Sequence, residues 1–347
     1  MKKKLLLVSS YSIHLLNYYD LIQDYFDEIL VISNKEDTRF SQFKQVDFSF
    51  KNTFSSIKEI RKTSLEFSPS IIHIHQANTV ALQVILAINR YKIPTLLTFL
   101  GSDVLHTPTR SIFHRWMLKF IVNNINFFTS DSLHMAEVAQ GYMNSKKKIL
   151  IANFGIKSEN IENTSKQNII YSNRLHKKFY RVDVIIDEFY NFLNSKATKD
   201  WKLIIGAIGE ETESLKDKVK KLEIESNVEF VGWVDAKSNA YYYSISKVFV
   251  AIPENDATSI SLLEAMYYGC IPFVVNVPSN REWIIDQFNG FLVDDVYSHF
   301  FKNIEQLKSD SIASVNTEII KLKGTKDVNK EKFISFYEEV FSDVKNN

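Results

Sequence analysis

The sequence contains a single cysteine, Cys270, among 347 residues, so no disulfide can close within one chain. Its glycine and isoleucine neighbours indicate a core position, and this cysteine usage predicts a reducing cytoplasm. No run of about 18 uncharged apolar residues occurs, so we expect no membrane-spanning helix. The basic start is followed by only four apolar residues, too few for a secretory signal, and we expect Lys4–Ser9 to be a buried first strand.

The sequence also lacks the short motifs of several enzyme classes. Ser9–His14 contains no glycine, so the dinucleotide fingerprint of nicotinamide and flavin oxidoreductases is missing after the first predicted strand. No P-loop, CxxC pair or HExxH motif occurs, and no metal ligand set is visible. We therefore expect no metal and no bound cofactor, and we expect no nucleic acid among the partners.

The composition is that of a globular protein, with 45% hydrophobic and 24% charged residues. The length exceeds what one ordinary core fills and predicts two domains. Residues 1–157 carry a net charge of +7, from 19 Lys and Arg against 12 Asp and Glu, and the remainder carries −6. A basic first half suits an anionic membrane surface or a lipid-linked acceptor, or it is simply solvated surface.

Short β-branched runs alternate with amphipathic helices, which predicts two doubly wound, Rossmann-like α/β domains with parallel sheets. We expect the first domain over residues 1–157 and the second over 168–325, joined by a polar linker at Lys157–Lys166. A final helix over 326–347 should cross back to the first domain. Ligands of such sheets bind beyond the carboxyl ends of the strands, so the two domains should face each other across a cleft.

Six strands are expected in each half. In the first half they are Lys4–Ser9, Glu28–Ser33, Ile71–His75, Thr95–Phe99, Phe127–Ser130 and Ile149–Asn153. In the second half they are Asn168–Ser172, Leu203–Gly206, Val228–Val231, Val248–Ile252, Ile271–Asn276 and Gly290–Val293. The helices expected between them include Leu15–Phe26, Val80–Tyr91, Asp183–Asn194, Leu215–Glu225, Ala236–Ser244 and Ser261–Tyr268.

The segment Pro253–Met266 joins an acidic loop to a predicted helix that begins near Ser261. The free N–H groups and positive dipole end of that helix would face the loop and form a seat for phosphate. Asp256 and Glu264 lie eight positions apart, so both carboxylates could face one ligand with a central diphosphate and hydroxyl-rich ends, such as a nucleotide sugar. The residues between them that we assign to the same ligand are Thr258, Ser259, Ile260 and Ser261. The alternative is a capping box, in which Ser261 and Glu264 only cap the helix.

This segment resembles the donor-binding signature of retaining glycosyltransferases of family 4. In that signature an acidic residue, seven intervening residues and a glutamate precede Ala-Met, a glycine and a proline, matched here by Asp256, Glu264, Ala265, Met266, Gly269 and Pro272. Asp256 differs from the commoner glutamate, although a version with aspartate occurs in the family. Ala257 differs from the usual glycine and requires a φ that a side chain allows.

Basic residues follow the first predicted strand of the second half. Cations just past the carboxyl end of a strand can neutralise a diphosphate and the charge that grows on a leaving group, although most basic loop residues only face solvent. The resemblance implies this role for Arg174 and for either Lys177 or Lys178, with Asn173 in place of the usual glycine. The family pattern of Arg-x-x-Lys, Tyr and Asp is matched by Arg174, Lys177, Tyr180 and Asp183.

Two further segments resemble the same family in their order and spacing. Leu203–Glu210 runs from a strand into a glycine turn, and Val228–Val234 resembles the strand and turn whose backbone cradles the nucleobase. The resemblance therefore assigns Gly209 and Trp233 to donor binding.

In the first half, Ile71–His75 followed by Thr98–Val104 resembles the first domain of the family. Alternation sends both strand histidines to one face, where we expect His73 to be structural and His75, at the carboxyl end, to reach a ligand. Many family members carry a histidine that contacts the donor sugar where this chain has Leu100, so that role is either missing here or taken by His75, Asp103 or His106. The residues assigned to the acceptor or sugar are Ser10, His14, His75 and Asp103.

Basic and large apolar side chains interleave over Arg110–Phe120. On a helix, one face would carry Ile112, Trp116 and Phe120, with Phe113 and Met117 beside it. Core packing is the interpretation that such a stripe favours. The alternative is a surface helix that inserts its aromatic side chains into a bilayer while Arg and Lys contact the headgroups.

The resemblance implies the GT-B fold and transfer of a sugar, with retention, from a nucleotide diphosphate sugar to a glycan or lipid-linked acceptor. The implied setting is bacterial synthesis of a surface polysaccharide, lipopolysaccharide or capsule, in the cytoplasm or on the inner face of the cytoplasmic membrane. Two alternatives remain open. A GT-B nucleotide-sugar epimerase would need no acceptor, and a non-catalytic nucleotide- or glycan-binding subunit is suggested by Leu100, Asp256 and Ala257.

Overall fold

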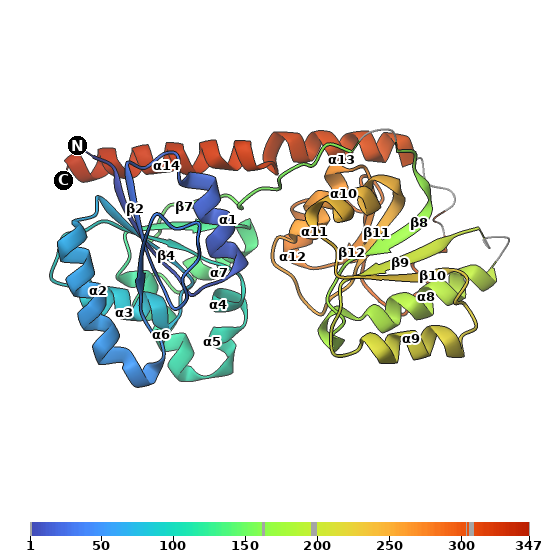
Figure 1. Ribbon diagram of the computed structural model, residues 1–347, viewed down its shortest axis with the longest axis horizontal. Helices are drawn as coiled ribbons and strands as arrows, with labels where there is room; N and C mark the ends of the chain where they lie inside the picture. Colours follow the sequence, from blue (N-terminus) through green and yellow to red (C-terminus); the bar gives the residue numbers. More distant parts are fainter. Residues whose placement is uncertain (1, 162–163, 196–199, 303, 305–308, 347) are drawn as a thin grey trace. The chain divides into compact units, whose positions relative to one another are not determined.

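The computed structural model of this chain describes residues 2–161, 164–195, 200–302, 304 and 309–346. Residues 162 and 163 of the predicted linker and residue 347 of the predicted last helix lie outside the described residues. The chain divides into two compact units. The first contains the residues up to Phe154 and those from Asn329 onward, and the second contains Gly155–Val328. Each unit holds one parallel sheet with helices on both faces, as predicted (Figure 1).

The first unit is built on a seven-stranded sheet in the order β3-β2-β1-β4-β5-β6-β7, with every neighbouring pair parallel. The chain moves outward from β1 in one direction and then, from β4, in the other. Parallel sheets of this kind bind ligands where the direction changes, at the carboxyl ends of the strands. The strands are β1 (Lys4–Val8), β2 (Glu28–Ser33), β3 (Gln42–Gln45), β4 (Ile71–His75), β5 (Thr95–Thr98), β6 (Phe127–Ser130) and β7 (Ile149–Ile151).

Helices cover both faces of this sheet, because alternate strand residues are apolar on each side. On β1, Leu6 and Val8 pack with α2, α3 and α6 in one apolar core, whereas Leu5 and Leu7 pack with α1 and α14 in another. The helical segments before the last helix are α1 (Ile13–Ile22), η1 (Phe50–Asn52), α2 (Thr53–Phe67), α3 (Thr79–Ile88), α4 (Ser102–Leu105), α5 (Thr107–Arg110), α6 (Ile112–Asn123) and α7 (Leu133–Gln140).

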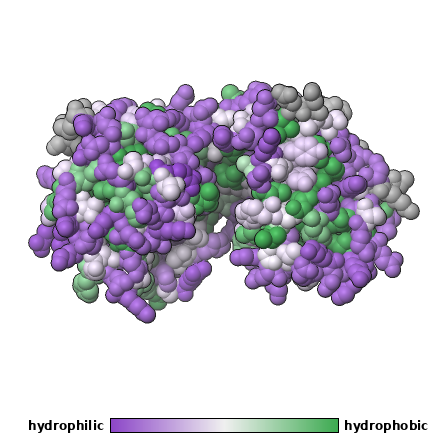
Figure 2. Space-filling view, viewed as in Figure 1, coloured by the Kyte–Doolittle hydropathy of each residue, from purple (hydrophilic) through white to green (hydrophobic). Residues whose placement is uncertain are grey.

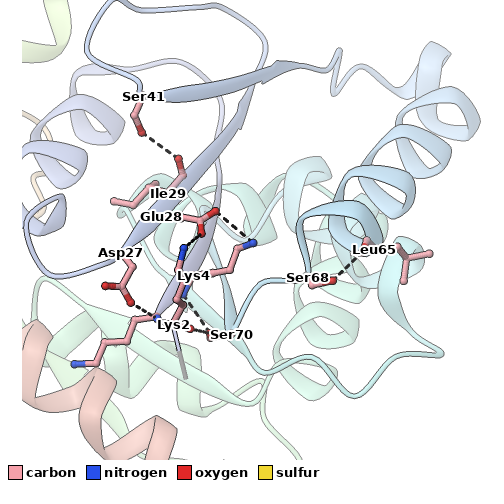
Figure 3. A network of polar contacts seen from close by, with 10 residues as sticks. Lys2, Lys4, Asp27, Glu28, Ile29, Ser41, Leu65, Ser68 and Ser70 are labelled. Carbon is pink, nitrogen blue, oxygen red and sulfur yellow. Dashed lines mark hydrogen bonds and ion pairs between the residues drawn. The ribbon is translucent and has the colours of Figure 1, made fainter.

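Polar contacts hold the start of β1 in register (Figure 3). The ammonium groups of Lys2 and Lys4 lie 3.3 Å and 3.4 Å from the two carboxylate oxygens of Glu28, at the start of β2. The backbone N–H of Lys4 donates to Ser70 Oγ at 3.2 Å, and the Ser70 hydroxyl donates to the carbonyl of Lys2 at 3.0 Å. The basic start therefore anchors the buried first strand.

Most of the last helix, α14 (Lys326–Asn346), belongs to the first unit and packs against its sheet. The Tyr337 hydroxyl lies 2.6 Å from the Tyr18 hydroxyl and 2.6 Å from Nδ1 of His73. The other ring nitrogen of His73 lies 2.7 Å from Thr98 Oγ1. Burial lowers the pKa of His73, and with both nitrogens bonded it has the structural role that its strand position predicts.

The second unit has a six-stranded parallel sheet in the order β10-β9-β8-β11-β12-β13, which is again the doubly wound arrangement. Its strands are β8 (Gln167–Ser172), β9 (Lys202–Gly206), β10 (Val228–Gly232), β11 (Ser246–Ala251), β12 (Ile271–Val275) and β13 (Phe291–Val293). Its helical segments are η2 (Lys178–Tyr180), α8 (Val182–Ser195), α9 (Thr212–Lys221), α10 (Ala236–Ile245), α11 (Ile260–Tyr267), α12 (Pro278–Arg281) and α13 (Ser309–Lys323).

Two apolar cores flank this second sheet. Ile170 and Val248 face α8 and α9, whereas Tyr171 and Phe249 face α10, α11 and α13. Two central strands, β8 and β11, lie side by side, so the loops that follow them meet at one edge of the sheet.

One strand was missed by the sequence pattern. The segment Gln42–Gln45 forms β3 and pairs with β2 at the edge of the first sheet. Its residues are exposed or half-buried, so the strand has no apolar alternation to signal it. Within the described ranges, no helix is both long and apolar enough to cross a bilayer. The face of the molecule in Figure 2 is mostly hydrophilic, with apolar side chains scattered among the polar ones.

Candidate active site

The predicted ligand-binding residues of the second unit gather at the carboxyl ends of its strands. Arg174 lies two residues after β8, and the loop with Asp256 follows β11, the neighbour of β8. Helix α11 begins directly after this loop and carries Glu264. Segments about 80 residues apart in the chain therefore meet because β8 and β11 are adjacent.

The start of α11 differs from the prediction. Ser259 is the N-cap, and its hydroxyl oxygen accepts from the N–H of Leu262 at 3.4 Å. The helix therefore begins at Ile260, one residue before Ser261. The capping-box interpretation is wrong, because the Glu264 carboxyl turns to a side chain of α10 and not to the backbone at Ser261.

Arg174 is held by two residues of the predicted site. Its guanidinium donates from Nη1 to Ser259 Oγ at 2.7 Å and from Nη2 to Asp256 Oδ2 at 3.0 Å. It also lies over the ring of Tyr180, 4.7 Å from the centroid. Only 12% of the Arg174 side chain and 17% of the Asp256 side chain are exposed, so solvent and salt screen this ion pair weakly. The guanidinium is thereby oriented before any ligand arrives.

The loop around Asp256 is fixed from a third strand end. The hydroxyl of Ser279, on α12, donates to the carbonyl of Asp256 at 2.7 Å. Ala257 does not adopt a positive φ, so the loop follows a path that does not require glycine there. Burial raises the pKa of the Asp256 carboxyl, and the adjacent Arg174 opposes that rise.

Glu264 lies on α11 and is half-buried. Its Oε2 accepts from Nδ2 of Asn239 at 3.2 Å, and the Tyr243 hydroxyl is a second hydrogen-bond partner. Burial raises the pKa of Glu264 from 4.5 to about 7, and the bond from Tyr243 limits that rise. A carboxyl group of this kind changes its charge near neutral pH, so a bound ligand can decide whether it is ionised.

The two lysine candidates are both exposed. Lys177 precedes η2 and Lys178 is its first residue. Neither forms an ion pair with another described residue, so either ammonium group could neutralise a phosphate near Arg174.

Gly209 lies in the turn after β9, against the backbone of the loop that carries Arg174. A Cβ at this position would lie 2.4 Å from the carbonyl oxygen of His176, so only glycine fits. The buried His176 ring bonds Thr212 Oγ1 at 2.8 Å and the Gly206 carbonyl at 3.1 Å. These contacts fix the turn after β9 to the loop after β8.

Trp233 follows β10 and is 71% exposed. Ile208, also exposed, follows the neighbouring strand β9. Both apolar side chains therefore stand at the carboxyl ends of adjacent strands. An exposed aromatic ring at such an edge suits stacking of a planar base.

In the first unit, two of the four assigned residues are accessible. Ser10 follows β1 and is half-buried, and His14 lies exposed in the first turn of α1. His75 is fully buried, with its ring stacked on Phe154 at 5.7 Å and edge-on to Tyr18 at 4.8 Å between centroids. The assignment of His75 to an acceptor or sugar is therefore wrong, because these rings enclose it. The same burial lowers the pKa of His75 to about 3.

Asp103 is also buried, and its carboxylate accepts hydrogen bonds from backbone N–H groups. Oδ2 accepts from the N–H of Ala77 at 2.8 Å, and Oδ1 accepts from the N–H of Leu100 at 3.1 Å. It thus ties the loop after β4 to the loop after β5. Its assignment as an acceptor or sugar contact is wrong for that reason.

The apolar stripe of α6 enters the core only in part, because Met117 is buried and Phe120 packs against the core whereas the rest does not. Ile112 is 87% exposed and Trp116 is 57% exposed, whereas the buried side of the helix carries Met117, Leu118, Ile121 and Val122. Phe113 is exposed as well and lies 6.0 Å from the ring of Phe50. Core packing is thus the wrong interpretation of Ile112 and Trp116.

Some residues of this site carried no sequence signal of their own. Asn239 and Tyr243 reach Glu264 from α10, and their spacing of four places them on one helix face. Polar and aromatic residues are common at such a spacing, so the pattern did not distinguish them. Among the described residues, no three His, Cys, Asp or Glu side chains are grouped as a metal site would require.

Models of two glycosyltransferase families match the two halves of the chain. The family model for glycosyl transferases group 1 matches residues 154–321, and the model for glycosyl transferase 4-like domains matches residues 3–132. The chain is 22% identical over 278 residues to the alpha-monoglucosyldiacylglycerol synthase of Streptococcus pneumoniae, covering 73% of this chain and 61% of that protein. It is 30% identical over 114 residues to an uncharacterized glycosyltransferase of Haemophilus influenzae, covering 33% and 30% of the two chains. The alignments thus span less than two thirds of these curated relatives.

Solved structures of glycosyltransferases share the fold. Anabaena HepE in complex with UDP superimposes with a TM-score of 0.79 at 12% identity, covering 97% of this chain and 100% of that one. The lipopolysaccharide outer core galactosyltransferase WaaB, in its apo form, superimposes with a TM-score of 0.74 at 13% identity, covering 96% and 99%. At these identities the likeness shows the fold alone.

Proposed function

Because the chain belongs to the group 1 glycosyltransferases and has the GT-B fold, we propose that it transfers a sugar from a nucleoside diphosphate sugar to a hydroxyl acceptor. The observation that carries the proposal is the contact of Arg174 with Asp256 and Ser259, beside the start of α11. A guanidinium held in place next to a helix N-terminus is the combination that binds a diphosphate. HepE was solved in complex with UDP, which supports a nucleoside diphosphate as the ligand class.

In the proposed reaction, the bond between the anomeric carbon and the diphosphate breaks while the acceptor oxygen bonds to the same face of that carbon. The proton of the acceptor hydroxyl passes to a phosphate oxygen of the leaving diphosphate. Arg174, together with Lys177 or Lys178, neutralises the charge that grows on this diphosphate, so the protein need not hold a metal. Asp256 and Glu264 accept hydrogen bonds from donor hydroxyl groups.

The remaining contacts of the donor follow from the same edge of the sheet. Trp233 stacks on the base, and Gly209 keeps the turn after β9 against the loop that carries Arg174, beside the diphosphate. Ser10 and His14, at the carboxyl end of β1, contact the acceptor or the sugar.

The acceptor that we propose is a glycan or a lipid-linked glycan used in bacterial surface polysaccharide synthesis, met at the inner face of the cytoplasmic membrane. Support comes from a surface on the first unit that we call the basic aromatic patch. Its members are exposed: the apolar Phe50, Phe54, Ile112, Phe113 and Trp116 and the basic Lys51, Lys58, Arg110, Arg115 and Lys119.

The composition of the patch suits an anionic bilayer. Phe54 is 90% exposed, and the contact between Phe50 and Phe113 joins the start of α2 to the start of α6. Between Asp103 and Asp131 the chain has no acidic residue. Aromatic side chains can enter the headgroup region while the cations bind anionic lipid.

The function is tested by incubating the purified chain with UDP-, GDP-, ADP- and dTDP-sugars, with and without glycan and lipid acceptors. We expect one donor class to release its nucleoside diphosphate, slowly in water and faster with an acceptor. Release that never exceeds the rate of an Asp256→Asn, Glu264→Gln double variant would refute transfer. A changed sugar nucleotide formed without any acceptor would instead identify an epimerase.

A further inference from the structure

A cluster of hydrogen bonds lies behind Glu264 and has no assigned role. It joins Tyr171 on β8, Asn173 directly after β8, and Asn239 and Tyr243 on α10. Asn239 in turn donates to Glu264 at 3.2 Å. Tyr243 is fully buried, and its ring packs edge-on against Tyr171 with 5.2 Å between centroids. The cluster therefore connects the loop of Arg174 to the carboxyl of Glu264 through the interior of the unit.

With Nδ2 of Asn173 facing it, the Asn239 amide has one orientation. Its Oδ1 accepts from the Tyr171 hydroxyl at 2.7 Å and from Nδ2 of Asn173 at 3.0 Å. A reversed amide would place two N–H groups against each other. The Nδ2 of Asn239 must therefore point to Glu264, to which it donates.

Asn173 fixes the second donor in the same way. Its Nδ2 also donates to the Tyr243 hydroxyl oxygen at 2.7 Å. The single O–H of Tyr243 is then free to donate to Glu264, while Ser261 is a further partner of the Tyr243 oxygen. One amide thus sets the direction of both groups that donate to Glu264.

We propose that Asn239 and Tyr243, oriented by Asn173, are positioning residues that aim the Glu264 carboxyl at the bound donor and favour its ionised form. This inference rests on the proposed function. It deepens that function, because it names the residues that keep a carboxylate ready at a site with little water. An ionised carboxylate accepts hydroxyl hydrogen bonds about twice as strong as those to a neutral group, which is what a donor with sugar hydroxyls needs.

The surroundings of Glu264 explain why two fixed donors matter. The titratable groups that face it are the tyrosines Tyr171, Tyr243 and Tyr268, all with pKa values raised by burial. No charged side chain among the described residues contributes to the pKa of Glu264, which burial raises to about 7. Without a cation nearby, neutral hydrogen-bond donors alone oppose the rise that burial causes in the pKa of this carboxyl.

The space behind the cluster is closed on the side of β9. A Cβ at Gly206 would lie 3.0 Å from the Tyr171 hydroxyl oxygen, so a side chain there would displace the group that orients Asn239. The Oδ1 of Asn173 is buried and has no hydrogen-bond partner among the described residues.

The test compares Tyr243→Phe and Asn239→Asp with Tyr242→Phe, the control. Tyr243→Phe removes only the hydroxyl. Asn239→Asp keeps an acceptor for Tyr171 and Asn173 but replaces the donor with a second acid. The hydroxyl of Tyr242, on the same helix, makes no hydrogen bond with another described residue.

The measurement is kcat/KM for the best donor from pH 5 to 9, with thermal unfolding of each variant alongside. We expect the acidic limb to move up by about one pH unit in Tyr243→Phe, because a hydrogen bond to a charged group is lost. Asn239→Asp should move it further, because two acids then share one site. Activity of Tyr243→Phe should recover at high pH, and the control should match the wild type.

A loss that is equal at every pH, or a lower unfolding temperature with an unchanged acidic limb, would overturn the inference and leave the cluster a structural role. If the wild type turns over no donor, the proposed function fails separately. The same variants are then compared by UDP binding against pH. We expect Tyr243→Phe to weaken binding about tenfold below pH 7 and not above pH 8, since one pH unit corresponds to a tenfold change. Binding that is weakened equally at both ends of this range would reject the positioning role.

Discussion

Replacement of Arg174 by alanine tests the centre of the proposed transfer. In the ligand-free chain the guanidinium is bound to Asp256 and Ser259 at 3.0 Å and 2.7 Å. In the proposed reaction the same group faces the charge that develops on the leaving diphosphate. The substitution therefore perturbs both the resting site and the transition state, and the two effects can be measured separately.

The cost to folding follows from the ion pair. Breaking a buried pair by removing one partner costs about 3–5 kcal/mol, because the other charge stays buried and unpaired. Because 17% of the Asp256 side chain is exposed, water compensates in part, and we expect the free energy of unfolding to fall by about 2 kcal/mol. Asp256→Asn together with Arg174→Ala should recover most of that loss, since no charge is then left unpaired.

The cost to turnover is larger. Removing one donor that stabilises developing charge lowers kcat by about 100- to 1000-fold, or about 3–4 kcal/mol. The nucleoside lies away from the guanidinium in the proposed site, so its affinity should not change, whereas affinity for the nucleoside diphosphate should fall. Arg174→Lys keeps the charge but not the two-pronged geometry and should fall between the wild type and alanine.

Binding is measured calorimetrically with the nucleoside, the nucleoside monophosphate and the nucleoside diphosphate, and turnover by release of the diphosphate. Tyr190→Phe on α8, half-buried and outside the residues assigned to the site, serves as the control. Equal losses of affinity for nucleoside and nucleoside diphosphate would show that Arg174 shapes the site without acting on the phosphates. Full turnover in Arg174→Ala would refute the proposed role outright.

Four further outcomes are expected. Glu264→Gln should lower turnover at least tenfold. Burial raises the pKa of Glu264 from 4.5 to about 7, so the stability that its protonated form contributes is present below pH 4.5 and lost as the pH rises through 7. The variant should therefore unfold at a higher temperature than the wild type at pH 8 and not at pH 4. The chain should sediment with anionic but not neutral vesicles, and Arg115→Glu with Lys119→Glu should abolish this binding, because each basic residue contributes about 1 kcal/mol. The same change at the exposed Arg90 and Lys92, just after α3, should leave the binding intact. Binding that does not depend on lipid charge would contradict the proposed role of the basic aromatic patch. Gly209→Ala should destabilise the second unit by more than about 1 kcal/mol in urea unfolding, because its Cβ would lie 2.4 Å from a backbone oxygen; an unchanged midpoint would show that the loop moves aside. Transfer should persist in EDTA, and its loss, restored by a divalent cation, would place a metal on the diphosphate.

The central strands of both sheets could be predicted from the sequence, because each is buried on both faces and its own residues are apolar enough to signal that burial. Glu28–Ser33 and Ile71–His75 are β2 and β4 with the bounds that the pattern predicts. The edge strand β3 was not predicted, because it is half-exposed and gains its strand conformation from pairing with β2 alone. The predicted start of α11 was one residue too late, because Ser259 and Ser261 are equally good N-caps in the sequence. In the structure Ser259 is the N-cap and also contacts Arg174.

The chemistry-bearing residues divide in the same way. Asp256, Glu264 and Arg174 were found because their types and spacing follow a linear motif, which the sequence by itself contains. Whether a side chain reaches solvent depends on what packs over it, and that depends on segments far away in the chain. The ring of Phe154 buries His75, and backbone groups after β4 and β5 bind the carboxylate of Asp103, whereas Trp116 remains exposed although Phe120 stacks on it. The strands and the motif were thus determined locally, but the burial of His75, the pairing of Arg174 with Asp256 and the cluster behind Glu264 were decided only by tertiary structure, because each depends on contacts between residues distant in the sequence.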